Sequence, residues 1–166
     1  MPAVALLQTG CLVAFAVLLG VAAWRDYRTL RIANGFSVAI IVVFALWALS
    51  GVVSGRGPSP ADVAWSVACA VSVFAVGAAA FAVGGTGGGD VKLLAAATLF
   101  AGPSLLLELV LVTAIAGGLL ALAALAGAPI GATAAGGAPS RWRRSIPYGP
   151  AIAVGGLWVV LARAAG

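Results

Sequence analysis

Histidine is absent from the chain, and cysteine occurs only twice in its 166 residues. The lack of histidine excludes a Ser-His-Asp triad and any other mechanism that needs an imidazole base. Cys11 and Cys69 lie in separate apolar runs with no second cysteine at metal-ligand spacing. We expect these thiols to be small apolar side chains inside the fold rather than zinc ligands. The sequence therefore predicts no metal and no cofactor.

Charge is also scarce, because charged residues make up 8% of the chain and hydrophobic residues 63%. Such a composition cannot fold as one water-soluble globule, so we expect an integral membrane protein in contact with the lipid bilayer. A helix needs about 20 apolar residues to cross a hydrocarbon core of roughly 30 Å, so the length allows about six spans with short connections. The predicted fold is all-α: a polytopic membrane helix bundle in which residues 1–166 form a single domain.

Glycine, proline and charged clusters divide the apolar sequence into predicted spans at residues 3–23, 36–53, 62–83, 91–102, 104–126 and 147–164. The fourth span is short, since a dozen residues rise only about 18 Å, and residues 91–126 could instead form one helix. Six spans with the N-terminus outside gather most basic residues on the inner face, whereas five would place the arginine cluster at 141–144 outside. We therefore predict six spans with a tight outer turn at Pro103. The predicted inner set is Arg25, Arg28, Arg31, Lys92, Arg141, Arg143 and Arg144, and the outer set is Arg56 and Arg163.

The net charge of +5 does not indicate a nucleic-acid partner. The basic residues flank apolar spans, and the orientation of a membrane protein accounts for them there.

The four acidic residues are the main candidates for chemistry. Asp62 follows Ser59-Pro60-Ala61 at the outer start of the third span, where a helix N-terminus stabilises a carboxylate. Glu108 lies about one turn inside the fifth span on the same outer side, and an intramembrane carboxylate is a functional hypothesis by default. Asp26 and Asp90 are both predicted at the inner face. Only these two can therefore form a pair, and paired carboxylates on a membrane scaffold suggest aspartyl proteolysis.

Each member of this pair also has a structural interpretation. Asp26 could balance the neighbouring arginines beside the membrane, and Asp90 could cap the helix that follows it. A cap does not account for the glycine-rich residues 84–89, because glycine is used where another backbone must come close. The loop is expected below the membrane surface, where irregular backbone is tolerated only beside protein or a water-filled cavity. Such a loop fits peptide docking, with Gly87 and Gly89 as the contact positions.

Three motifs occur in order, one in each predicted inner loop. Asp26 is followed by Ile32-Ala33-Asn34, residues 87–93 read Gly-Gly-Gly-Asp-Val-Lys-Leu, and residues 146–151 read Ile-Pro-Tyr-Gly-Pro-Ala. Together they resemble the type 4 prepilin peptidase family, the bacterial branch of the GxGD intramembrane aspartyl peptidases. Ala33 stands where that family usually has proline, which loosens the start of the second span but leaves Asn34 able to cap it.

The resemblance implies a membrane aspartyl endopeptidase that removes the short basic leader of type IV prepilins at the cytoplasmic face of the bacterial inner membrane. Asp26 and Asp90 would be the catalytic residues, and two carboxylates a few ångströms apart would share one proton. Gly87, Gly89, Asn34 and Lys92 would form the substrate-binding loop. Lys92 is expected to mark the inner interface rather than to join the reaction.

The bifunctional members of that family carry a cysteine-rich zinc insertion linked to N-methylation. The loop that ends at Asn34 has no room for it and no cysteine. The resemblance therefore implies a short, peptidase-only form, as in Flp (tight-adherence) pilus systems. The expected partners are prepilin precursors and other pilus-assembly proteins.

Two other classes of protein stay open. A small channel or transporter would also bury carboxylates and interrupt a helix with glycine. A non-catalytic assembly subunit would use small residues such as Gly117, Gly118 and Ala121 to pack helices.

Overall fold

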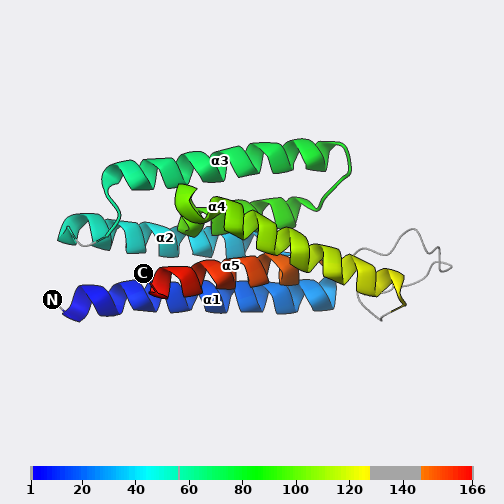
Figure 1. Cartoon of the computed structure of the whole chain (residues 1–166), viewed down its shortest axis with the longest axis horizontal. Coiled ribbons are helices and arrows are strands. Elements are labelled where there is room, and N and C mark those ends of the chain that lie inside the picture. The colour runs from blue at the N-terminus through cyan, green and yellow to red at the C-terminus, as the bar shows by residue number, and fades with distance from the viewer. Residues whose placement is uncertain (1, 56, 128–146, 166) are drawn as a thin grey trace.

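The computed structural model describes residues 2–55, 57–127 and 147–165. Within these ranges the chain forms five helices and no strand (Figure 1). The helices are α1 (Pro2–Thr29), α2 (Asn34–Ser54), α3 (Pro60–Ala82), α4 (Gly88–Leu125) and α5 (Gly149–Ala165). The predicted all-α bundle is therefore confirmed.

Helix α4 is two helical arms joined at a sharp break. Gly102 has φ 59° and ψ −170°, and Pro103 follows it. Proline cannot donate the backbone hydrogen bond that would continue the helix, and glycine tolerates the positive φ angle that the turn requires. In Figure 1 the chain runs one way along the first arm and returns along the second. The tight turn predicted at Pro103 is thus present, one residue earlier than expected.

The helices pack in antiparallel pairs around the first arm of α4. Phe100 near the end of that arm stacks on Phe15 of α1 at 4.3 Å between ring centroids and meets Phe44 of α2 edge-on at 5.3 Å. Helix α5 packs against α1 and α4. Its Gly155 and Gly156 lie so close to Thr113 and Leu19 that a Cβ atom at either glycine would collide with them, as in membrane helices where small residues let backbones approach.

Large apolar side chains cover the outside of the bundle; Leu6, Val53 and Leu161 are 71%, 79% and 65% exposed. An apolar exterior of this extent fits a lipid environment rather than water. Helices α1 to α4 are long and apolar enough to cross a membrane, and α5 is a shorter apolar helix of 17 residues. The protein is accordingly a multi-pass membrane protein.

Helix α1 continues beyond its predicted end at residue 23 and reaches Thr29. Residues 24–29 contain neither glycine nor proline, so nothing in them stops the helix. The residue after the helix, Leu30, has φ 51°, so the helical backbone stops there. Asp26 consequently lies on the last turns of the helix and not in a loop.

The side chain of Arg163 forms hydrogen bonds with the backbone at the break in α4. Its Nε donates to the carbonyl oxygen of Phe100, its guanidinium also donates to Ala101 O at 3.3 Å, and it lies 5.1 Å from the centroid of the Trp47 ring. These carbonyls belong to the last turn of the first arm, where no intrahelical donor is left for them. Arg163, which the sequence placed among the outer loop charges, is therefore half-buried in the bundle.

We predict that Arg163→Met destabilises the protein by about 1–3 kcal/mol, because two carbonyl groups in a water-poor site lose their donors. Thermal unfolding in detergent measures this. Arg28→Met is the matched control, since Arg28 is exposed and contacts the Trp24 ring at 4.6 Å. Equal melting temperatures for the two variants would show that Arg163 does not hold the break.

Candidate active site

Asp26 is a nearly buried carboxylate whose side chain is 4% exposed. Its Oδ2 accepts a hydrogen bond of 2.8 Å from the backbone N–H of Gly149, the first residue of α5. A helix N-terminus has free N–H groups and a partial positive charge, so it stabilises an anion placed there. The beginning of α5 therefore fixes both the position and the charge environment of Asp26.

Gly149 fits this contact because it has no side chain. A Cβ atom at this position would lie 2.7 Å from Asp26 Cβ and 2.8 Å from Oδ2. The adjoining Pro147 is fully buried, and Gly117 packs against the ring of Tyr148. Residues 147–149 thus anchor the start of α5 between α1 and the second arm of α4.

Asp90 is the third residue of α4 and is half-buried. The residue that caps this helix is Gly87, whose backbone N–H is hydrogen-bonded to the Asp90 carboxylate. This is the acidic half of a capping box, in which the side chain reaches back to the first residue. The interpretation of Asp90 as the residue at the cap position is therefore wrong, because that residue is Gly87, three positions earlier.

The two aspartates line the same pocket, which has a volume of about 750 Å³. Its remaining walls come from three places. They are Arg25 and the segment from the last residue of α1 to the first residue of α2, residues 29–34, together with the glycines at 87–89. The structure brings together the two carboxylates that the sequence placed on one face.

Asn34 lines the pocket, and its side chain is bonded to Lys92 of α4. Lys92 Nζ donates to Asn34 Oδ1 at 2.9 Å, so α4 is tied to the first residue of α2. The cap position of α2 is Ala33, whose side chain makes no capping bond, so the prediction that Asn34 caps this helix is wrong. Its amide oxygen is engaged by Lys92 instead.

The glycines of the loop before Asp90 contact the protein itself. A Cβ atom at Gly87 would lie 2.5 Å from Asp90 Oδ2, and one at Gly89 would lie 3.0 Å from Ile32 Cβ. Gly87 has φ −81°, and the positive φ angle in this loop falls on Gly84. Neither Gly87 nor Gly89 has a positive φ angle, and a side chain at either position would crowd Asp90 or Ile32.

The other acidic residues lie away from the pocket. Asp62 forms a full capping box with Ser59, accepting from Ser59 N at 2.9 Å and donating its own N–H to Ser59 Oγ at 3.1 Å. Glu108 accepts a hydrogen bond of 2.6 Å from Trp158 Nε1. The structural interpretation of Asp62 is confirmed.

Two further predictions concern metal ligands and loop charges. Among the described residues no cluster of three potential metal ligands exists. The predicted inner arginines at 141, 143 and 144 and the predicted outer Arg56 lie outside the described residues.

Gly149 is the site residue that sequence reasoning did not single out. The Pro-Tyr-Gly-Pro motif around it was visible, but the motif alone does not say that its glycine N–H faces Asp26 from a position 123 residues away.

We predict that Gly149→Ala lowers the stability of the protein by about 1–3 kcal/mol, because the new methyl group overlaps the Asp26 side chain. Gly118→Ala is the matched control: Gly118 also lies in a helix, and a Cβ atom added there would have nothing within 4 Å. This control should be neutral or slightly stabilising. The melting temperatures of the two variants in detergent are compared with that of the parent. An unchanged melting temperature for Gly149→Ala would mean that α5 is not held against Asp26.

Comparison with known proteins adds a family assignment. The family model of the type IV leader peptidase family matches residues 13–122, which include Asp26 and Asp90. No curated protein and no solved structure matches the chain. The family match covers well over half of the sequence, so the chain belongs to the type IV leader peptidase family.

Proposed function

We propose that the protein is an aspartic endopeptidase that cleaves the leader from type IV prepilins of the Flp kind, with Asp26 and Asp90 as its catalytic pair. Family membership supports peptidase activity on prepilins. The observation that carries the assignment of residues is the single pocket lined by both carboxylates, one from the end of α1 and one from the start of α4.

The reaction follows from two carboxylates in one pocket. Their charges repel, so the pair holds one proton between them near neutral pH. The ionised carboxyl group takes a proton from a water molecule as that water attacks the scissile carbonyl carbon, and the protonated one donates to the carbonyl oxygen. Collapse of the tetrahedral intermediate breaks the C–N bond, and the proton gained from water passes to the leaving amine. The pair titrates as a unit, so neither aspartate is assigned as base or acid.

Backbone N–H groups hold each carboxylate in place for this chemistry. Gly149 N–H donates to Oδ2 of Asp26, and in this proposal Oδ1 is the oxygen that meets the water or the shared proton. Gly87 N–H orients Asp90 in the same way. Positioning by backbone groups at two helix starts suits a site that must keep its geometry while substrates come and go.

The connection between α1 and α2 supports a peptidase-only form. Helix α1 ends at Thr29 and α2 begins at Asn34, so residues 30–33 leave no room for a cysteine-rich insertion. On this ground we assign no N-methylation to the protein, and we place it with the short members that serve Flp pili.

The distribution of charge supports an active site at the cytoplasmic face. Arg25 and Arg31 line the pocket, and Lys92 is hydrogen-bonded to Asn34, which also lines it. Positive residues beside the ends of spans favour the cytoplasmic side of the inner membrane. We therefore place the N-terminus of α1 outside and the aspartate pocket inside.

Replacing either aspartate by asparagine tests the proposal. Asp26→Asn and Asp90→Asn should each reduce prepilin cleavage in detergent by about a hundredfold or more, because asparagine keeps the size of the side chain but cannot share the proton. The matched control is Asp62→Asn, whose position lies in the capping box of α3 and which should cleave at close to the parental rate. The amount of folded protein is measured in parallel. Near-parental cleavage by either pocket variant would remove that aspartate from the catalytic pair.

A further inference from the structure

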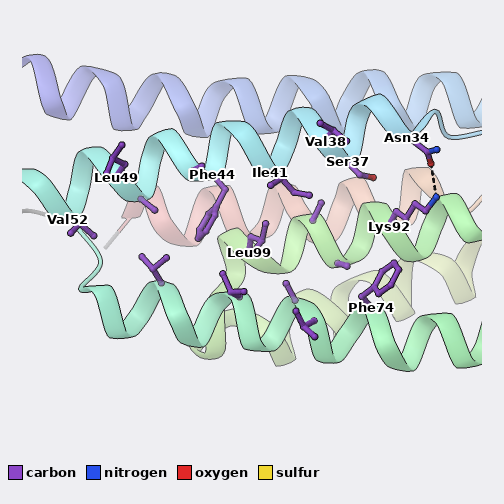
Figure 2. A pocket seen from close by; sticks show the side chains of 18 of the residues that line it. Asn34, Ser37, Val38, Ile41, Phe44, Leu49, Val52, Phe74, Lys92 and Leu99 are labelled. Carbon is purple, nitrogen blue, oxygen red and sulfur yellow. Dashed lines mark hydrogen bonds between the residues drawn. The ribbon is translucent and has the colours of Figure 1, made fainter.

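A long apolar groove runs between α2 and α3, with the first arm of α4 as its floor (Figure 2). Its volume is about 1030 Å³. Its walls carry large apolar side chains that are 44–62% exposed although they face the groove; these are Val38, Ile41, Leu49, Val67, Val71 and Phe74. Its floor on α4 consists of Lys92, Ala95, Ala96 and Leu99, so small residues lie near its middle. Small residues let another helix approach closely within a membrane.

One end of the groove lies beside the aspartate pocket. Asn34 lines both the groove and that pocket. In Figure 2 the hydrogen-bonded pair of Asn34 and Lys92 lies at this end, and Leu49 and Val52 lie at the other. The groove therefore adjoins the pocket that holds Asp26 and Asp90.

The length of the groove matches a membrane-spanning helix. Its lining on α2 extends from Asn34 to Val52, a stretch that rises about 27 Å at 1.5 Å per residue. The hydrocarbon core of a bilayer is roughly 30 Å thick. An occupant of this length would be a whole transmembrane helix rather than a short peptide.

The polar groups of the groove gather at its pocket end. Besides Asn34 and Lys92, Ser37 lies there. Its side chain is 6% exposed, and its hydroxyl has no hydrogen-bond partner among the residues that the structure describes. The first N–H groups of a helix also lack partners within that helix. A helix that begins at this end would bring unpaired N–H groups to the part of the groove that has polar side chains.

From this arrangement we infer that the groove between α2 and α3 binds the apolar transmembrane helix of the substrate and delivers the peptide bond before that helix to Asp26 and Asp90. The inference rests on the proposed function. It adds where the substrate is held: recognition comes from apolar contact along α2 and α3, away from the carboxylates.

Filling the groove tests this. Ala45 lines it near the middle of α2 and is exposed, so Ala45→Trp occupies the groove without entering the core. Ala68 on α3 is equally exposed but does not line the groove, so Ala68→Trp is the matched control. Two substrates are compared: a full prepilin, and a water-soluble peptide that spans the leader and cleavage site but lacks the apolar helix.

We expect the ratio of prepilin to peptide cleavage to fall at least about tenfold in Ala45→Trp and to keep its parental value in Ala68→Trp. An unchanged ratio in both variants would overturn the groove assignment. If the parent cleaves prepilin but not the peptide, the loss of prepilin cleavage in Ala45→Trp relative to Ala68→Trp decides instead. Failure of the parent to cleave either substrate would count against the proposed function itself.

A photoreactive residue at position 45 or 68, in the Asp90→Asn background that retains uncleaved substrate, gives a second readout. A covalent adduct with prepilin from position 45 and not from position 68 supports the inference. Adducts with lipid alone at position 45, under conditions in which the parent cleaves prepilin, would show that the groove is a lipid site and overturn it.

Discussion

The contact between the N-terminus of α5 and the carboxylate of Asp26 is the constraint on which the rest of the site depends. It joins residues 123 positions apart with one backbone hydrogen bond of 2.8 Å. For this bond to form, α5 must lie against α1 closely enough that a methyl group at Gly149 or Gly156 would collide with its neighbour. A carboxylate in an apolar bundle is costly unless it is hydrogen-bonded. The N–H group of Gly149 meets that requirement through one oxygen of Asp26, and Asp26 still lines the pocket.

The break in α4 is the second structural condition for the site. The first arm begins at the pocket with Asp90 and ends at Gly102, and the second arm returns toward the start of α5, where Gly117 meets Tyr148. Arg163 satisfies carbonyl groups at the break and so links the far end of α5 to the far end of the first arm. The first arm of α4 therefore carries Asp90 at one end and is held by Arg163 at the other. The same short arm forms the floor of the apolar groove.

The sequence predicted the all-α membrane bundle, the turn near Pro103 and the pairing of Asp26 with Asp90. Those predictions depended on local signals: apolar length, a proline, and charges beside the spans. The sequence did not predict that Gly149 holds Asp26, that Asn34 binds Lys92, or that Arg163 donates to carbonyl oxygens at the break in α4, because each depends on contacts between segments far apart in the chain. The interpretation of the glycine loop as a docking surface stays a prediction, and the structure adds that Cβ atoms at Gly87 and Gly89 would meet Asp90 and Ile32 of the protein itself. Glycine type alone does not distinguish an internal close approach from an external one.

The central claim is that Asp26 and Asp90 activate water directly for peptide hydrolysis. Mass spectrometry of a prepilin digested by the purified protein in ¹⁸O-labelled water tests this claim most directly. We expect two fragments, with one ¹⁸O atom in the new carboxyl group of the leader after a single turnover and no leader fragment attached to the protein. A covalent adduct between the leader and the protein, or an intact prepilin after prolonged incubation with folded protein, would contradict it.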